Sequence, residues 1–238
     1  MSSSLKLEWA THKAAKYACT HWHYSRSMPS AQCKVGVWEN DKFIGVVLFG
    51  IGAGASTNGS RYGLSAHRDV AELVRVALKP HDAPVSKIVS IALRMMKKAN
   101  PGIRIVISFA DEMGQGHIGG IYQAGNWIYA GAFEGDGGFI IHGKPVHTRT
   151  VTSRQGWKAS LGWLRKYVDP NATKNKTKKH RYLMPMDSEM RQRLQQFSKP
   201  YPKRSKQAMA GPPAQRRGGT DPNAPISTSP SDGGKFNK

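Results

Sequence analysis

The sequence is short of acidic residues, cysteine and long apolar runs, and each shortage excludes a class of protein. Its 238 residues contain 15 Asp+Glu against 36 Lys+Arg, a formal net charge of +21, which predicts a polyanionic partner. Two cysteines, Cys19 and Cys33, exclude a disulfide framework and favour a reducing compartment. No apolar run reaches the roughly 18 residues of a membrane-spanning helix, and the first residues lack the features of a secretion signal. We therefore expect a cytoplasmic protein without a membrane partner.

The positive charge is concentrated toward the end of the chain. Residues 1–150 hold 17 Lys+Arg and 10 Asp+Glu, whereas residues 151–238 hold 19 and 5. Residues 199–238 contain seven of the 14 prolines and, of the Val, Ile and Leu types, only Ile226. Such a segment buries too little apolar surface to offset its ordering entropy. We predict a catalytic domain at 1–150, a basic helical extension packed on it at 151–198 and a disordered basic tail at 199–238.

The first 150 residues predict alternating helices and strands. Two β-rich runs, 35–39 and 43–49, flank the turn signal Asn40-Asp41 and predict a hairpin. Further strands are expected at 72–78, 103–109 and 127–133, and helices at 9–17, 85–96 and 114–124. The helix at 85–96 is amphipathic and follows a strand through the short loop 79–84. A strand, loop and helix in this order offer main-chain N–H groups and a helix dipole to a phosphate.

The order of these elements resembles the core of the Gcn5-related N-acetyltransferase fold, and the stretch from Ile121-Tyr122 to Gly131 is similar to one that follows its fifth strand. The resemblance implies an α+β fold in which a mixed, mainly antiparallel sheet is flanked by helices. It also implies acetyl-CoA or another acyl-CoA as cofactor. The residues that it suggests for cofactor binding are Val76, Leu78, Val85, Ser86, Asn126 and Tyr129.

A more specific resemblance is to the phage Mom proteins, which modify adenine in DNA to N6-carbamoylmethyladenine. It rests on His23-Tyr24, Arg75 within Glu72-Leu-Val-Arg, Asp111 after Ser108-Phe-Ala, the run from Gly116-His117 to Gly131, Lys179 to Pro185, and Tyr201 to Arg204. The resemblance implies a transferase that acts on double-stranded DNA in the host cytoplasm and protects it from restriction. It suggests His23, Tyr24, Arg75, Asp111 and Tyr122 as catalytic residues and raises iron as a further cofactor.

The chemistry of these residue types suits that reaction. Histidine titrates near neutrality, so His23 is a candidate to remove a proton from the attacking amine. Asp111 is a candidate to accept a hydrogen bond from that amine, or else it caps a following helix. Arg75 interrupts an apolar strand, so it either faces solvent or pairs with a carboxylate or phosphate.

Aromatic and metal-binding roles are further alternatives for these residues. Tyr24 and Tyr122 either pack in the core or stack on an extruded base and donate a proton to a leaving thiolate. His21 and His23 form a His-x-His pair that on a strand would point to one face, and Asp111 would complete a metal-binding triad.

The basic back part predicts DNA-phosphate contacts. Five Lys or Arg residues occur within the eight residues from Lys174 to Arg181, and Lys203-Arg204 follow later. Phosphate contacts of this kind are insensitive to sequence and weaken with salt. The alternative is a solubilising charge run. The residues concerned are Lys174, Lys176, Lys178, Lys179, Arg181, Lys203 and Arg204.

Two other functions fit parts of the sequence. A CoA-dependent N-acetyltransferase that acts on a protein amine would use the same fold, and the basic extension would then bind a nucleic-acid-associated substrate. A non-catalytic DNA-binding protein would explain the charge but would leave the His, Tyr, Arg and Asp residues of the front domain without a role. The sequence makes no prediction of oligomeric state.

Overall fold

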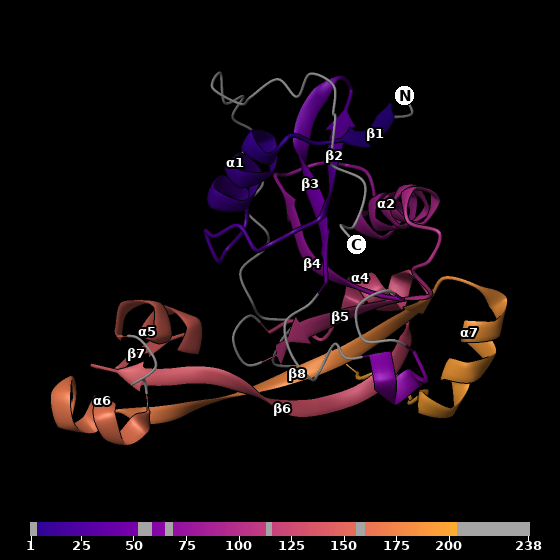
Figure 1. Ribbon diagram of the computed structural model, residues 1–238. Helices are drawn as coiled ribbons and strands as arrows, with labels where there is room; N and C mark the ends of the chain where they lie inside the picture. The colour runs from indigo at the N-terminus through magenta and orange to yellow at the C-terminus, as the bar shows by residue number, and fades with distance from the viewer. Residues whose placement is uncertain (1–3, 52–58, 65–68, 113–115, 156–159, 204–238) are drawn as a thin grey trace. The chain divides into compact units, whose positions relative to one another are not determined.

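The computed structural model describes residues 4–51, 59–64, 69–112, 116–155 and 160–203 (Figure 1). Its strands are β1 (Leu5–Trp9), β2 (Cys33–Glu39), β3 (Lys42–Gly50), β4 (Val70–Leu78), β5 (Ile105–Asp111), β6 (Ile128–Ile141), β7 (Lys144–Val146) and β8 (Thr173–Pro185). Its helices are α1 (His12–Trp22), α2 (Val85–Ala99), α4 (Gly120–Ala124), α5 (Thr148–Gln155), α6 (Leu161–Tyr167) and α7 (Ser188–Leu194), with 3-10 turns η2 (Gly59–Tyr62) and η4 (Gln195–Phe197).

The strands form a mixed sheet in the order β1-β2-β3-β4-β5-β8-β6-β7. Strands β1 to β4 pair antiparallel with their neighbours, as do β6 and β7, whereas β4 and β5 are parallel. The parallel ladder is short and joins Val70–Glu72 to Ile105–Ile107. The predicted α+β class with a mixed, mainly antiparallel sheet is therefore confirmed.

The chain divides into two compact units. The first contains residues 1–108, 120–130 and 182–238, and the second contains residues 109–119 and 131–181. The boundaries cut strands β5, β6 and β8, so each of these strands contributes to both units.

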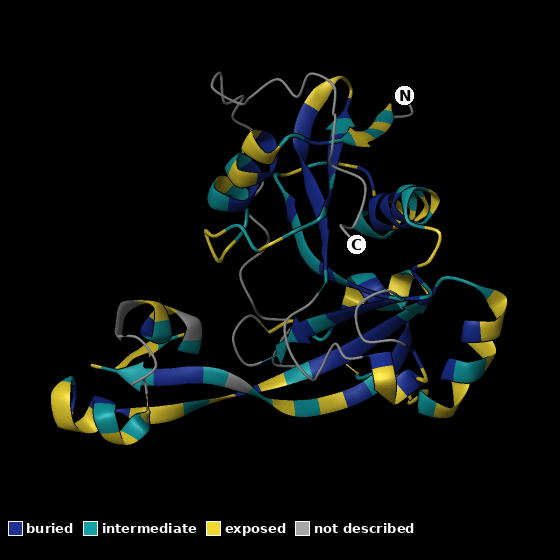
Figure 2. Cartoon of the chain, in the orientation of Figure 1, coloured by how far each residue is buried: buried dark blue, intermediate teal, exposed yellow. Residues whose placement is uncertain are grey.

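The front hairpin of the first unit agrees with its prediction. Strands β2 and β3 are joined at Asn40 and Asp41, which adopt positive φ angles of 50° and 60°. Two consecutive left-handed residues are what a two-residue hairpin turn of type I′ requires, and Asn and Asp tolerate them. Most residues of both strands are buried (Figure 2).

The first helix differs from its prediction at both ends. Trp9, expected to begin the helix, is the last residue of strand β1, and α1 begins after Thr11, whose side chain accepts from the N–H of Ala14. The helix continues to Trp22 because its buried face extends through Cys19 and Trp22 packs against the same core cluster. The helix thus ends five residues later than the predicted end at residue 17.

Helices α1 and α2 cover opposite sides of strands β2 to β4 (Figure 1). Helix α1 packs small residues, among them Ala14 and Ala18, against Val46 and Leu48 of β3. Helix α2 buries Ile88, Val89, Ala92, Leu93 and Met96, the apolar face that the sequence predicts. The part of the chain that the structure describes contains no helix long and apolar enough to cross a membrane.

The helical extension predicted at 151–198 also contains a long strand. Residues 173–185 form strand β8, and the described residues on either side of it include helices α5, α6 and α7. The reason is the period of two in Lys174, Lys176 and Lys178, which are exposed, whereas the alternate Thr177 is buried. Helices α5 and α6 bury Val151 and Leu164 in a small core with residues of β6 and the loop before β8.

The predicted tail is fixed at its beginning. In the first unit, the N–H of Lys199 donates to the carbonyl of Tyr129 at 2.8 Å, and the Tyr201 hydroxyl donates to the carbonyl of Trp127 at 2.6 Å. Ordered contacts therefore extend to Tyr201, and residues 204–238 lie outside the described residues.

Candidate functional site

A cluster of polar side chains forms where the end of α1 meets the middle of β4. Arg75 lies opposite Leu48 in the β3/β4 ladder, and Leu48 packs against α1. Residues directly opposite each other share a face of the sheet, so Arg75 points toward α1. The C-cap residue of that helix is His23. Nη1 of Arg75 lies 2.8 Å from Nδ1 of His23 and donates to Oγ of Ser25 at 2.7 Å.

Hydrogen bonds determine the state of the His23 ring. The main-chain N–H of Ser25 donates to Nδ1 at 3.1 Å, and the Arg75 guanidinium, which has only donors, makes its shorter contact with the same nitrogen. Because a guanidinium only donates, these contacts favour the tautomer with a lone pair on Nδ1 and the proton on Nε2. The predicted role of His23 as a base would need the lone pair that Arg75 and Ser25 occupy.

Part of the Arg75 guanidinium is buried without a partner. Its Nε has no hydrogen-bond partner, and its side-chain contacts within the described residues are with His23 and Ser25 rather than with a carboxylate. Burial lowers the pKa of Arg75, and the neighbouring Cys19 and Tyr24 partly offset this effect. A buried cation without a counter-ion is costly, so this position suits an anionic group of a ligand.

Tyr24 is the exposed member of the cluster. Its ring centroid lies 4.0 Å from that of His23, and 57% of the residue's surface is exposed. An exposed aromatic ring beside a hydrogen-bond donor can stack on a planar group and orient it. This exposure favours a stacking role for Tyr24 over packing in the core.

Tyr122 is instead buried, and its hydroxyl is hydrogen-bonded to Ser108. The Ser108 hydroxyl lies 2.8 Å from the Tyr122 hydroxyl and donates to the carbonyl of Leu73 at 2.9 Å. The main-chain pairing of β4 with β5 ends at Glu72, so the carbonyl of Leu73, the next residue of β4, accepts from the Ser108 side chain instead of from a main-chain N–H of β5. Burial raises the pKa of Tyr122 to about 12, and the hydrogen bond to Ser108 acts in the opposite direction. The phenol is therefore neutral at physiological pH.

The loop before α2 contains its own anion. The carboxylate of Glu39, only 7% exposed, accepts from the N–H of Ala83 at 2.8 Å and from the N–H of Asp82 at 3.0 Å. Pro80 and Pro84 contribute no N–H. A pyrophosphate in this loop would face a carboxylate and would lose two of its expected donors. The loop therefore does not fit the pyrophosphate of an acyl-CoA.

The residues predicted for cofactor binding are distributed over several elements. Val76 and Leu78 belong to β4 beyond its ladder with β5, and Val85 and Ser86 form the first turn of α2. Tyr129 is buried, with its ring centroid 5.2 Å from that of Tyr182. Asn126 is exposed and has a left-handed φ of 57°. Their cofactor roles stay predictions.

The structure does not assemble the predicted metal ligands. His21 lies in the last turn of α1, where Nδ1 is 2.9 Å from the carbonyl of Tyr17 and the ring stacks on that tyrosine. Because α1 extends to Trp22, His21 and His23 are not on a strand, and residues two apart on a helix do not share a face. Among the described ranges, no three His, Cys, Asp or Glu side chains are gathered as metal ligands.

Asp111 is the last residue of β5 and belongs to the second unit. Its side chain is partly buried, and its main-chain carbonyl accepts from the N–H of His117 at 3.1 Å. Its catalytic role remains a prediction.

Strand β8 presents three of the predicted DNA-binding lysines on one exposed face. Lys174 lies 4.3 Å from the centre of the Phe139 ring, Lys176 pairs with Glu134 at 3.7 Å and Lys178 pairs with Glu112 at 2.9 Å. Hydrogen bonds from Lys178, and to a smaller extent from His180, lower the pKa of Glu112. Exposed ion pairs of this kind are weak, so a phosphate can compete for the lysines.

Arg181 is the exception among the basic residues. It is 9% exposed, and its guanidinium lies 4.8 Å from the ring of Phe133 and 5.9 Å from that of Phe109. Arg181 therefore packs inside the second unit, because at its position the strand faces inward, and its predicted contact with DNA stays a prediction. Lys179 is partly exposed, Lys203 is exposed, and Arg204 lies outside the described residues.

Three residues of this region were missed by the sequence analysis. Ser25 and Ser108 supply hydroxyl groups to His23, Arg75 and Tyr122, and Glu39 closes the loop before α2. Ser108 begins the motif that ends at Asp111, and Glu39 is an acidic residue at the end of a buried strand. Both signals were present, but a serine or a glutamate has no chemical role until its partners are known.

The fold and the cluster define an α+β protein in which a partly buried arginine and a histidine meet beside a mixed sheet. A family model described as the Mom protein family matches residues 4–203, and the chain belongs to this family. The chain is 28% identical over 211 residues to the methylcarbamoylase Mom of Escherichia phage Mu, a match that covers 85% of each chain.

Solved structures with detectable similarity are distant. One is a protein assigned as a phosphinothricin N-acetyltransferase, with 14% identity, a TM-score of 0.43 and coverage of 78% of this chain and 100% of that chain. Another is a protein assigned as an acetyltransferase from Acinetobacter baylyi ADP1, with 8% identity, a TM-score of 0.41 and coverage of 78% and 94%.

Proposed function

We propose that this protein is a DNA-modifying transferase that converts adenine to N6-carbamoylmethyladenine and thereby protects phage DNA from host restriction. The observation that carries the proposal is membership of the Mom family over residues 4–203, a range that includes every described residue of the polar cluster. The relative from phage Mu is named a methylcarbamoylase. The net charge of +21 and the exposed lysines of β8 suit a double-stranded DNA substrate.

The polar cluster suggests a division of labour at the target base. Modification of the N6 amine requires the adenine to leave the duplex, and the exposed ring of Tyr24 is a surface on which it can stack. His23 offers an N–H at Nε2, so we assign it a donor role toward the group being transferred, in place of the base role expected from its pKa. Arg75, with its unpartnered Nε, holds a negative charge on the donor or on the DNA.

The proposal is tested in cells that express the protein with a plasmid. The plasmid DNA is digested to nucleosides, and deoxyadenosine is examined by mass spectrometry. We expect a carbamoylmethyl mass increment with the wild type and with Arg191→Ala, an exposed arginine of α7. With Arg75→Ala we expect a loss of about 10²-fold or more, the usual consequence of removing one preorganised donor.

Two controls make the result decisive. Arg75→Lys keeps the charge but loses the planar guanidinium, whose Nη1 contacts both His23 and Ser25, so it should stay strongly impaired. Thermal unfolding establishes that the Arg75 variants are folded. An unmodified adenine pool with soluble, abundant wild-type protein would rule out the proposed reaction, and full activity of folded Arg75→Ala would remove this cluster from it.

A further inference from the structure

Helix α6 carries an exposed aromatic ring that the proposed reaction does not use. Among the described residues, three large aromatic side chains are exposed, those of Tyr24, Tyr167 and Tyr201. Tyr24 belongs to the polar cluster, and the hydroxyl of Tyr201 donates to the carbonyl of Trp127. Tyr167, the last residue of α6, is 61% exposed. A single exposed ring is ordinary on a protein surface, so its neighbours decide whether it is a binding surface.

Trp163 supports the ring of Tyr167. The two residues are four positions apart in α6 and therefore share a face of the helix, and their ring centroids lie 5.5 Å apart with the planes at 38°. Trp163 is half-buried, because it packs against the small core around Phe139 and Leu164. The pair thus consists of one anchored ring and one exposed ring. Little side-chain entropy is lost when such a tyrosine binds a flat partner.

Hydrogen bonds fix the connection between α6 and β8 in the second unit. Nε of Arg165 donates to the carbonyl of Ala172 at 2.9 Å. The carboxylate of Asp169, a residue only 6% exposed, accepts from the N–H groups of His142 and Asn171 at 2.6 and 2.9 Å. These bonds tie the end of α6 to the turn after β6 and to the residues before β8 (Figure 1). The aromatic pair therefore has a defined position beside the basic strand.

Basic side chains surround the aromatic pair. The exposed Lys166 places its Nζ 5.1 Å from the centre of the Tyr167 ring. Lys174 at the beginning of β8 lies 4.3 Å from the ring of Phe139, a member of the same small core. The one acidic residue between positions 160 and 178 is Asp169, whose carboxylate is already hydrogen-bonded. A flat ring with a cationic margin is complementary to a nucleobase and its phosphates.

A nucleobase can compete with Lys166 for the Tyr167 ring. Stacking of a base on an aromatic ring is stronger than an exposed cation–π contact, and the displaced lysine can then reach a phosphate. A membrane fits this surface less well. Helix α6 has seven residues and buries its Leu164 in the core, so little apolar area is left for lipid.

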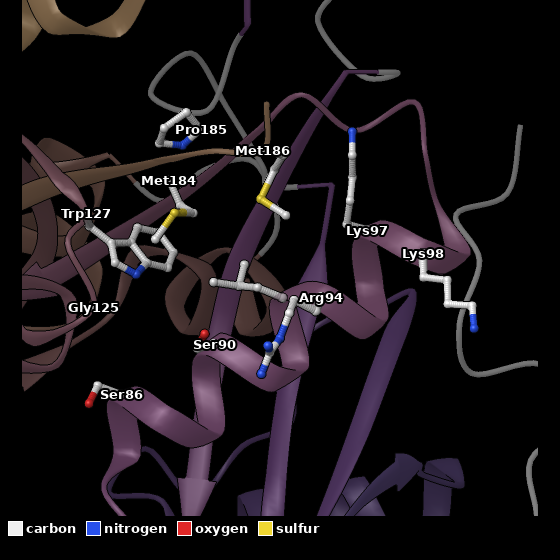
Figure 3. A pocket seen from close by; sticks show the side chains of 11 residues that line it. Ser86, Ser90, Arg94, Lys97, Lys98, Gly125, Trp127, Met184, Pro185 and Met186 are labelled. Atoms are coloured by element: carbon white, nitrogen blue, oxygen red, sulfur yellow. The ribbon is translucent and has the colours of Figure 1, made fainter. Parts of the chain in front are cut away.

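In the pocket beside α2, by contrast, the aromatic ring is closed to stacking (Figure 3). This pocket of about 430 Å³ belongs to the first unit, and Trp127 contributes to its lining. Trp127 is 1% exposed, so neither face of its ring is open to a base. Exposure therefore favours α6 as the surface for stacking.

We propose that Tyr167 stacks on an unpaired base of the DNA substrate while Lys166 and Lys174 bind the adjacent phosphates. Modification of the N6 amine requires a base pair to open, and opening leaves a base without its partner for an exposed ring to bind. The inference rests on the proposed function, because that function supplies the unpaired base.

Fluorescence anisotropy with labelled DNA and the full-length protein tests this surface. The probes are a fully paired duplex and the same duplex in which one thymine faces an abasic position. We expect the wild type to bind the second duplex more tightly, and Tyr167→Ala to reduce that preference about tenfold, as loss of one base–aromatic stack does. Tyr167→Phe keeps the ring and should behave like the wild type.

Lysine variants separate phosphate contacts from stacking. Lys166→Ala should weaken binding of both duplexes equally and reduce the log-log salt slope by about 1. Lys13→Ala, at an exposed lysine of α1, should bind both duplexes like the wild type. Thermal unfolding establishes that each variant is folded.

Photochemical cross-linking of the wild type gives a second measurement. With 5-iodouracil as the unpaired base, irradiation should join the DNA to Tyr167 or Trp163. Equal binding of the two duplexes by the wild type, an unchanged preference in folded Tyr167→Ala, or a cross-link at Tyr24 without one on α6 would overturn the inference. Binding of anionic vesicles that depends on Tyr167, without a preference for the unpaired base, would assign the surface to a membrane and would overturn it as well.

Adenine modification is measured separately by mass spectrometry. Modified adenine together with an unchanged preference in Tyr167→Ala would remove this inference and leave the proposed function. Unmodified adenine together with a preference that depends on Tyr167 would remove the proposed reaction and leave the stacking surface.

Discussion

Replacement of Glu39 by alanine should destabilise the protein through the loop before α2. Glu39 makes two charge-assisted hydrogen bonds to main-chain N–H groups, and bonds to a charged group contribute about 1.5–3 kcal/mol each. Ala83 is 7% exposed, so its N–H would be left buried and unsatisfied, whereas Asp82 is exposed and water can replace its bond. We therefore expect a loss of about 2–4 kcal/mol in the free energy of unfolding.

Equilibrium unfolding in urea measures this loss. With an m-value of about 2 kcal/mol/M, in the middle of the usual range for urea, the midpoint of Glu39→Ala should fall by about 1–2 M. Glu39→Gln keeps one carbonyl acceptor and should lie between the alanine variant and the wild type. Glu8→Ala is the matched control, because Glu8 is an exposed residue that pairs with Lys6 at the surface, and its midpoint should hardly move.

The hydrogen bonds of Glu39 also predict how the loop before α2 responds to CoA. If Glu39 fills the loop, titration of the wild type with CoA should leave the backbone amide resonances of Asp82 and Ala83 unmoved, whereas Glu39→Gln should shift both. A midpoint for Glu39→Ala equal to that of Glu8→Ala would refute the reasoning about stability. Saturable movement of the two amides with CoA would show instead that the loop is an anion site.

Two further predictions concern Tyr122 and the basic face of β8. Burial raises the pKa of Tyr122 to about 12, so the stability that the neutral phenol contributes is present below about pH 10 and is lost as the pH rises toward 12. The urea midpoint of the wild type should therefore fall more steeply above pH 10 than that of Tyr122→Phe. Parallel plots of midpoint against pH for the two proteins would contradict a buried phenol. The triple alanine variant of Lys174, Lys176 and Lys178 should bind duplex DNA more weakly, with a log-log salt slope reduced by about 2–3. A triple variant of the exposed Lys13, Lys16 and Lys42 has the same net charge, and equal slopes for the two triples would exclude β8 as the DNA-binding face.

Local patterns explain which elements were predictable. The hairpin around Asn40-Asp41 and helix α2 carry their signals within a few residues, the first as turn chemistry and the second as apolar residues at helical spacing. Strand β8 carries its signal as alternating lysines, but high charge density favoured the prediction of an extension outside the sheet. Helix α1 was placed too early because its end depends on Trp22 packing against Phe43, a residue distant in the sequence.

The sequence by itself determined the charge, the family resemblance and the identity of His23, Tyr24, Arg75 and Tyr122 as candidates, because these follow from residue types and short motifs. Only the tertiary structure decided what each one does. Arg75 occupies the lone pair of His23, Ser108 binds Tyr122, Glu39 fills the loop expected to hold a phosphate, and Arg181 packs between aromatic rings. Each of these contacts joins residues that lie 14 to 72 positions apart in the sequence and belong to different elements or loops. Hydrogen-bond state and burial depend on such distant partners, and no local pattern specifies them.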